Sequence, residues 1–288
     1  LSLFTAPTSS VLLKLTSTAN LEGAFNASTN LSTNTIFFTT NVWNSEKSVI
    51  IYGVDDVLVD GDVPYDIQIE VTSLDANYNG IFVPKINLIN TDNDNPKVVI
   101  TDTLGVELSR TTSFSVTEGT NSMMHLHLQT IPSANVAMDV TLSDNTYADL
   151  SLDGGNTQSA NVLITYTDST FGDNQTLTLV AREDSIISGN ELYSLTFSAN
   201  SAQTLDTSGY KDLTTLPLEI LRVENDIPGV MVSALAGNTN ESGPSANTTF
   251  MVALETVPTE IVTLTMTSDN EQEVKVKIGF STITFLAD

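Results

Sequence analysis

The sequence predicts an all-β chain of tandem two-sheet sandwiches, and three observations lead to this fold class. Residues 65–72 alternate apolar and polar without interruption, which is the period of a strand that buries one face. Turn-forming runs such as Asp153-Gly154-Gly155-Asn156 separate segments of this kind, and no window of useful length has apolar residues at helical spacing. The pattern also repeats, because Pro7, Pro132 and Pro258 end matching Thr-x-Pro runs that lie 125 and 126 residues apart.

Matched residues fix the repeat more tightly. One gapless offset of 128 residues relates 36–65 to 164–193, and it places Asp55-Asp56 on Glu183-Asp184. A period of this length indicates an array of domains. We expect a repeat lacking its N-terminal strands over 1–95, a complete repeat over 96–227, and the N-terminal part of a further repeat over 228–288. Because the outer repeats are incomplete, we expect the chain to be a window of a longer protein.

The individual strands follow from alternating apolar residues, taken in chain order. The clearest segments cover 65–72, 124–128, 136–142, 177–181, 193–197, 250–254 and 262–266. Seven or so short strands per repeat, separated by turn formers, indicate immunoglobulin-like sandwiches. The links Asn95-Pro96 and Ile227-Pro228 are too short for free tumbling, so consecutive sandwiches should lie end to end.

The composition limits the possible partners. The chain has 288 residues, with 10 basic and 35 acidic side chains and a formal net charge of −25. Nucleic acid is excluded as a partner, because binding phosphates requires a basic face. No apolar run approaches the ~18 residues of a membrane span, so we expect no direct membrane insertion of this segment. One interpretation of the acidity is simply that it keeps a surface protein soluble.

Acidic side chains recur at matched places in the repeats. Residues 91–96 read Thr-Asp-Asn-Asp-Asn-Pro and residues 223–228 read Val-Glu-Asn-Asp-Ile-Pro, each at the end of a repeat. Carboxylates gathered at one end of a sandwich repel one another unless a divalent ion neutralises them, and hard cations prefer such oxygen ligands. The alternative is that they are scattered turn residues, since turns favour Asp and Asn. Their recurrence at matched positions favours metal binding.

A set of short motifs resembles a known family. In the central repeat they are Val116-Thr117-Glu118-Gly119, Phe171 before the Gln175–Leu179 strand, the pair Glu183-Asp184, and a hairpin ending in Glu191-Leu192-Tyr193, followed by the terminal Glu-Asn-Asp. This order resembles the Calx-beta repeat of sodium–calcium exchangers and of many long extracellular proteins. The repeat here is longer, through insertions at 145–163 and 198–215. The resemblance implies Ca²⁺ bound at one end of each sandwich.

The resemblance also implies a set of metal ligands, carried over position by position. They are Asp55, Asp56, Asp60, Asp92 and Asp94 in the first repeat, Glu118, Asp149, Glu183, Asp184, Glu191, Glu224 and Asp226 in the central repeat, and Glu241 in the third. The chain departs from the family pattern at several places, where Ser188, Asn190, Val63, Asn93 and Asn225 replace acids or interrupt acidic runs. Fewer carboxylates predict weak binding, with dissociation constants of ~10⁻⁴–10⁻³ M, as in extracellular modules.

These observations predict a function. We expect a calcium-stiffened, non-catalytic structural segment of an extracellular or cell-surface protein, such as a filament or an adhesin. Its partners would be the neighbouring repeats, with self-assembly into a filament or surface layer. An enzyme is not expected, because the chain has no Cys, no nucleophile elbow and no phosphate loop. Two alternatives stay open: a calcium-sensing regulatory module, and a module that binds glycans or a protein ligand.

Overall fold

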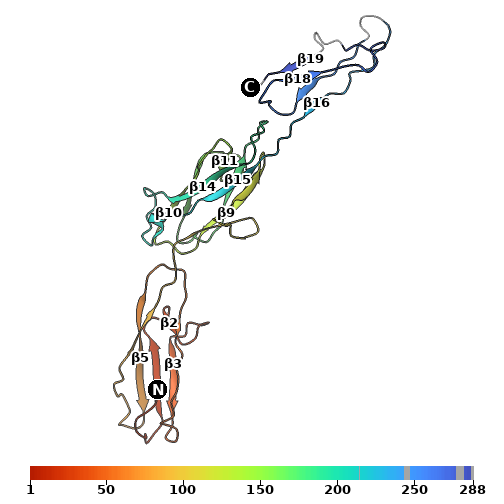
Figure 1. Cartoon of the computed structure of the whole chain (residues 1–288). Helices are drawn as coiled ribbons and strands as arrows, with labels where there is room; N and C mark the ends of the chain where they lie inside the picture. Colours follow the sequence, from red (N-terminus) through yellow and green to blue (C-terminus); the bar gives the residue numbers. More distant parts are fainter. Residues whose placement is uncertain (214, 243–246, 277–281, 287–288) are drawn as a thin grey trace.

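The computed structural model is an all-β chain of three successive bodies arranged end to end (Figure 1), which confirms the predicted fold class. It describes residues 1–213, 215–242, 247–276 and 282–286, so part of the third predicted repeat lies outside the described residues. We name the bodies by their strands: the first sandwich contains β1 to β6, the central sandwich β7 to β15, and the third β16 to β19.

The first sandwich has one larger sheet and one small one. The larger sheet has four strands in the order β3-β1-β5-β6, and β2 pairs with β4 in the small sheet. The predicted alternation over 65–72 is confirmed, because Tyr65, Ile67 and Val71 are buried while Gln68 and Glu70 are exposed. The strands are β1 (Val11–Ser17), β2 (Gly23–Ala24), β3 (Thr33–Phe38), β4 (Tyr52–Gly53), β5 (Val63–Ser73) and β6 (Ile86–Asn90).

The central sandwich has two complete sheets that enclose one hydrophobic core. One sheet has the order β12-β10-β14-β15-β8, and the other has the order β11-β13-β9-β7. Alternate side chains of both sheets are buried between them, among them Met124, Leu179 and Leu195. The strands are β7 (Val98–Thr101), β8 (Phe114–Thr117), β9 (Asn121–Leu128), β10 (Val136–Leu142), β11 (Ala148–Ser151), β12 (Asn161–Tyr166), β13 (Gln175–Ala181), β14 (Glu191–Ala199) and β15 (Leu218–Val223). A short 3₁₀ helix, Tyr210–Asp212, lies between β14 and β15.

The third sandwich is described through two strand pairs. The pairs are β16 (Val230–Val232) with β17 (Val252–Leu254), and β18 (Val262–Thr265) with β19 (Thr282–Phe285). The side chains of β16 are exposed on both faces, in contrast to the buried residues of the equivalent strand β7.

Strand pairing repeats in register along the chain. Val11 pairs with Phe38, Val136 with Tyr166, and Val262 with Phe285. In the same way, Val98 pairs with Leu128 and Val230 with Leu254. The predicted match of 36–38 to 164–166 is therefore confirmed by strand register, and 283–285 occupies the equivalent place in the third sandwich. This repeated pairing lets a position in one sandwich be compared directly with its counterpart in the next.

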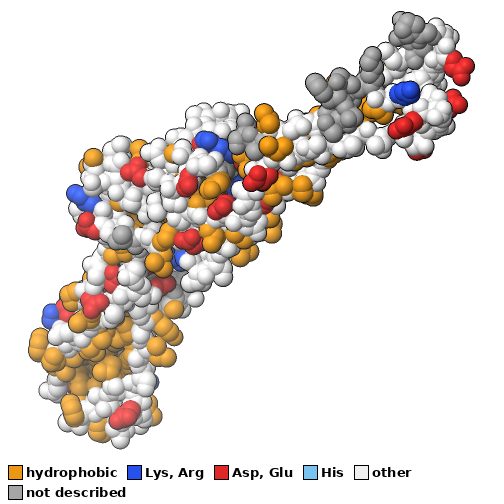
Figure 2. Space-filling view, turned by 45° about the horizontal axis from the view of Figure 1, so that its top comes forward, with side chains coloured by type: hydrophobic (Ala, Val, Ile, Leu, Met, Phe, Trp, Pro, Cys, Tyr) orange, Lys and Arg blue, Asp and Glu red, His pale blue; other side chains and the backbone are white. Residues whose placement is uncertain are grey.

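The surface differs among the three bodies. Figure 2 shows hydrophobic side chains gathered over a face of the first sandwich, at the lower end of the molecule in that view. This fits a body with one larger sheet, since a single sheet leaves part of its apolar face uncovered. Within the described part of the chain, no helix has the length and apolar character needed to cross a membrane.

The core of the central sandwich should carry most of its stability. Leu179 lies on β13 and is fully buried, so Leu179→Ala should lower the free energy of unfolding by about 2–5 kcal/mol. Leu163 on β12 is 37% exposed, and Leu163→Ala should change it by less than about 1 kcal/mol. Urea denaturation of both variants measures the difference, and equal losses would contradict this assignment of the core.

Candidate metal centres

Two parallel strands bring the first pair of acids together in the central sandwich. Strand β8 pairs with β15 in parallel, with Val116 opposite Arg222 and Thr117 opposite Val223. Since parallel strands end at the same edge of a sheet, the residues that follow them are neighbours. Glu118 and Glu224 follow directly, and the Glu118 N–H donates to the Val223 carbonyl at 3.1 Å. The fold thus places two carboxylates, predicted from distant motifs, side by side.

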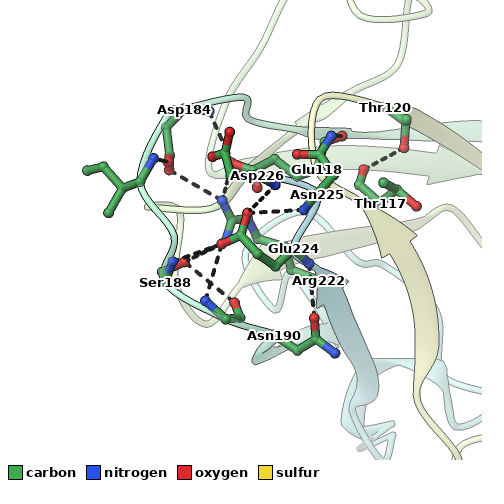
Figure 3. A network of polar contacts seen from close by, with 12 residues as sticks. Thr117, Glu118, Thr120, Asp184, Ser188, Asn190, Arg222, Glu224, Asn225 and Asp226 are labelled. Carbon is green, nitrogen blue, oxygen red and sulfur yellow. Dashed lines mark hydrogen bonds and ion pairs between the residues drawn. The ribbon is translucent and has the colours of Figure 1, made fainter. Parts of the chain in front are cut away.

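Arg222 lies buried among these acids, as Figure 3 shows. Its side chain is 1% exposed and forms ion pairs with Glu118, with Asp184 at 3.3 Å and with Glu224 at 3.9 Å. Its guanidinium also lies over the ring of Tyr147, 5.3 Å from the ring centre. A buried carboxylate is costly without a partner of opposite charge, so Arg222 supplies the positive charge that this edge of the sheet requires.

Glu224 is held by main-chain N–H groups of the hairpin before β14. Its Oε2 accepts hydrogen bonds from the N–H groups of Ser188 (2.8 Å) and Gly189 (3.2 Å), and its Oε1 accepts from that of Asp226 (2.9 Å). The positive φ of Gly189 allows this turn. The Asp226 N–H, with those of the hairpin, lowers the pKa of Glu224 to about 2, so Glu224 is ionised at neutral pH.

The two other acids of this cluster have raised pKa values. Burial raises the pKa of Glu118, and the adjacent Glu224 raises it further. Burial also raises the pKa of Asp226, with the negative charges of Glu224, Glu183 and Asp184 adding to the effect. Each shift reflects a carboxylate that lacks enough positive charge around it.

Unpaired oxygen atoms make this cluster suitable for a cation. Oxygen atoms of Glu118, Glu224 and Asp226 lie within 4.8 Å of one another. Glu118 Oε2 and Asp226 Oδ2 are buried and have no hydrogen-bond partner. Buried polar atoms are almost always paired, and carboxylate oxygens are the ligands that Ca²⁺ prefers. The residues therefore fit a divalent cation held by Glu118, Glu224 and Asp226, which we call the central cluster.

The structure places the other predicted ligands of the central and third repeats in different surroundings. Glu183 lies against Gly119, where any side chain would collide with its carboxylate. Asp149 instead accepts two hydrogen bonds from Arg182, at 2.8 and 3.0 Å. Glu191 begins β14 opposite Arg222 and is partly buried, whereas Glu241 is exposed.

The first sandwich brings its five predicted acids around one hollow of about 400 Å³. Glu22, which the sequence motifs do not indicate, also lines it, and the lining residues include no Lys or Arg. Burial raises the pKa of one member, Asp94, and the four other predicted acids raise it further by their charge. We call this set the first cluster: Glu22, Asp55, Asp56, Asp60, Asp92 and Asp94.

Both clusters are built on the same plan. The Asp92 carboxylate accepts hydrogen bonds from the N–H groups of Asp94 (2.8 Å) and Gly61 (2.7 Å). Glu224 accepts the equivalent bonds from Asp226 and Gly189. These N–H groups lower the pKa of Asp92, again as for Glu224.

The clusters differ at two equivalent positions. Asn90 pairs with Val63 as Arg222 pairs with Glu191, so Asn90 occupies the place of Arg222. The carbonyl of Glu22 accepts the Val54 N–H as that of Tyr147 accepts the Arg182 N–H, so Glu22 occupies the place of Tyr147. Asn90 hydrogen-bonds Glu22 at 3.2 Å. Where the central sandwich has the guanidinium of Arg222 and the ring of Tyr147, the first sandwich thus has the amide of Asn90 and the carboxylate of Glu22.

Sequence reasoning missed Glu22, Arg222 and Tyr147. The repeat offsets contained the signal, since an offset of 125 places Glu22 on Tyr147 and one of 132 places Asn90 on Arg222. Only strand pairing shows that these two positions face the acids.

Comparisons with known proteins add little to this geometry. No family model matches the sequence, and no curated protein sequence matches it. The structure is similar to the crystal structure of the calcium binding domain CBD12 of CALX1.1, at 9% identity and a TM-score of 0.30. That match covers 77% of this chain and 86% of the other. At such a TM-score the likeness carries no argument, and the resemblance to Calx-beta repeats stays a prediction from short motifs.

Arg222 should be essential to the metal-free central sandwich. In the presence of a chelator, Arg222→Met leaves Glu118 buried without its partner, which should lower the free energy of unfolding by about 3–5 kcal/mol. Adding Glu118→Gln should restore part of that loss, because no unpaired buried charge then remains. Lys85→Met, which breaks an exposed pair with Asp66, should cost less than about 1 kcal/mol. A loss for Arg222→Met no larger than that of Lys85→Met would contradict this role.

Proposed function

We propose that this chain binds calcium at the ends of its sandwiches and serves as a stiffened, non-catalytic structural segment. The observation that carries the proposal is the central cluster, where Glu118 Oε2 and Asp226 Oδ2 are buried and unpaired beside Glu224. When bound, a divalent cation supplies the charge that these oxygen atoms lack. Glu118, Glu224 and Asp226 would hold it. Arg222 would stay paired with Oε1 of Glu118, the oxygen opposite the unpaired Oε2.

The first cluster supports the proposal through its charge. Six carboxylates line the hollow, and no Lys or Arg is among its lining residues. The first cluster has Asn90 where the central sandwich has Arg222, so we expect the first cluster to depend more strongly on a cation. Both clusters lie where one sandwich meets the next, with Asp94 two residues before Pro96 and Asp226 two residues before Pro228. A cation there would limit bending of a very short link.

Binding strength connects the site to a location. Asn93 and Asn225 interrupt the terminal acids, and in the central repeat Ser188 stands at the equivalent of Asp60. The central cluster therefore has only the carboxylates of Glu118, Glu224 and Asp226, which predicts weak binding there. Affinities of ~10⁻⁴–10⁻³ M are filled by extracellular calcium and not by that of a resting cytosol. We therefore place the segment outside the cell, as part of a surface protein, filament or adhesin whose repeats set reach and stiffness.

Calcium should raise the melting temperature of the chain. In 1 mM calcium a site with a dissociation constant of ~10⁻⁴ M adds ~1.4 kcal/mol per ion through mass action, which should raise the melting temperature by at least about 4 °C, whereas a ~10⁻³ M site adds only ~0.4 kcal/mol. Magnesium should do less, because it demands octahedral geometry and retains its water. Scanning calorimetry in calcium, magnesium and chelator measures the effect, and identical melting in all three would remove calcium from the proposal.

Single acids should be separable in the same measurement. Asp226→Asn should abolish most of the calcium effect on the central sandwich, while Asp94→Asn should act on the first. Asp173→Asn is the matched control, because it also removes one acid. Asp173 is exposed and precedes β13, whereas the acidic pair Glu183-Asp184 follows that strand. If Asp173→Asn reduced the calcium effect as much as Asp226→Asn, net charge and not a site would explain the stabilisation.

Protons should compete with calcium for these acids. Because the pKa values of Glu118, Asp226 and Asp94 are raised in the folded chain, their contribution to metal-free stability is present at low pH and lost as pH rises through those values. Glu224 and Asp92, whose pKa values are lowered, contribute in the opposite sense and lose their contribution only as pH falls below about 4.

The calcium-induced rise in melting temperature should therefore be largest near pH 7 and shrink toward about pH 5. Melting curves with and without calcium across this range test the trend, with Glu118→Gln as a variant whose dependence should be flatter. A calcium effect that grew as pH fell would rule out carboxylate ligands with raised pKa values.

A further inference from the structure

One main-chain contact recurs between successive sandwiches. The Ile131 N–H donates to the carbonyl oxygen of Val57 at 2.9 Å, and the Val257 N–H donates to that of Ser185 at 2.7 Å. Leu58 and Ile131 also form a parallel β-bridge. Each donor precedes the proline of a Thr-x-Pro run, and each acceptor directly follows an acidic pair. The next sandwich therefore touches the preceding one at the loop that carries its acids.

The two contacts occupy equivalent positions. The donors are 126 residues apart, as are the paired strand residues Val136 and Val262, and the acceptors are 128 residues apart, as are Phe38 and Tyr166. Side chains differ between the contacts, with Ile and Val as donors and Val and Ser as acceptors. Because main-chain atoms make the bond, it tolerates such differences. The recurrence marks a device of the repeat and not an accident of one junction.

The second acid of each pair shapes the acceptor loop. Asp56 Oδ1 accepts the Leu58 N–H and Asp184 Oδ1 accepts the Ile186 N–H, both at 2.7 Å. This is the turn in which an Asp side chain bonds the main chain two residues later. Val57 and Ser185 lie in the middle of these two turns, and their carbonyl oxygens accept the hydrogen bonds from the next sandwich. Asp56 and Asp184 thus fix the direction of that carbonyl.

The donor loop is anchored in its own sandwich. Thr130 Oγ1 hydrogen-bonds the buried Tyr210 hydroxyl at 2.8 Å, and Asp206 Oδ1 accepts the Ser133 N–H at 2.8 Å. Pro132 is buried between them. The residue before a proline is confined to extended conformations, which leaves little freedom for Ile131.

The first sandwich has an equivalent loop with the same support. Thr5 Oγ1 hydrogen-bonds the Tyr78 hydroxyl at 2.6 Å, Asp75 Oδ2 accepts the Thr8 N–H at 2.8 Å, and Ala6 is exposed between them. By contrast, Ile131 and Val257 are partly buried. The same support thus accompanies the loop whether its middle residue is exposed, as Ala6 is, or partly buried, as Ile131 is.

We propose that the loop before each of these prolines is a preformed docking surface for the acid-pair loop of the neighbouring sandwich. Its partner is a turn closed by an Asp side chain that presents one free carbonyl oxygen. The hydrogen bond sets the register between sandwiches and joins main-chain atoms. Asp56 and Asp184 close the acceptor turns in the absence of any metal ion, so we expect docking to persist without calcium. The inference goes beyond calcium binding and can fail or hold separately from it.

Amide hydrogen exchange of the whole chain in chelator tests the docking surface. The Ile131 and Val257 amides should exchange about tenfold or more slowly than that of Ala6, after correction for sequence. The Ser133 amide, bonded inside the central sandwich, is an internal reference for a stable bond. If Ile131 and Val257 exchanged as fast as Ala6, the docking surface would be refuted whether or not the chain binds calcium.

Spin-label distances across the first junction test the role of Asp56. The chain has no Cys, so Lys14→Cys on β1 and Thr165→Cys on β12 provide two unique exposed sites. In chelator, Asp56→Ala should broaden the distance distribution, whereas Asp56→Asn should not, since its amide oxygen still accepts the Leu58 N–H. Ile131→Pro, which removes the donor, should broaden it as well, and Ile131→Ala should leave it narrow.

These variants separate the turn from its charge. Broadening in Asp56→Ala and Ile131→Pro alone supports docking through the main chain. Equal broadening in Asp56→Asn and Asp56→Ala would show that charge holds the junction and would overturn the proposal. Unchanged distributions in all four variants would overturn it too. Asp56 is exposed and lies outside the sheets of the first sandwich, so its variants test docking and not folding. Ile131 is partly buried, so the melting of the central sandwich is measured for its variants to show that this sandwich stays folded.

Discussion

The parallel pairing of β8 with β15 is the constraint on which the central cluster depends. The sandwich needs this pairing to complete its five-stranded sheet, and the pairing forces Glu118 against Glu224 at a common edge. Two carboxylates in contact cannot both ionise without compensation. Arg222 and the main-chain N–H groups around Glu224 compensate this charge, while burial, together with the adjacent Glu224, raises the pKa of Glu118.

The two clusters differ in how the repulsion between their carboxylates is compensated. In the central cluster Arg222 is buried against Tyr147, which gives a permanent positive charge and a surface to hold it. In the first cluster Asn90 and Glu22 stand at these places, and the charge of the lining is entirely negative. A buried guanidinium cannot leave, whereas a dissolved cation can. Repeats with one template thus differ in how much of the charge at their junction is compensated by the chain itself.

Much of the fold followed from local sequence patterns. Alternation predicted β5 and β10 closely, and the offset that aligned 36–38 with 164–166 is confirmed by the equivalent pairing positions of Phe38 and Tyr166. The gathering of Asp55, Asp56, Asp60, Asp92 and Asp94 also followed from matched positions. Arg222 did not, because its neighbours depend on a parallel pairing between strands about a hundred residues apart. Asp149 was predicted as a metal ligand, but the structure pairs it with Arg182 instead. That ion pair also depends on strand pairing, because Arg182 follows β13, which lies beside the strand of Asp149.

Charge and register are handled by different atoms at each junction. Side-chain oxygens of Asp55, Asp92 and their neighbours carry the charge, whereas the Val57 carbonyl and the Ile131 N–H carry the contact. Asp56 belongs to both sets, because it lines the hollow and closes the turn that presents Val57. An interaction made by main-chain atoms is insensitive to salt and pH, while one made by carboxylates is not. If the proposed calcium binding and docking hold, such a junction keeps its orientation while its stiffness follows the cations around it.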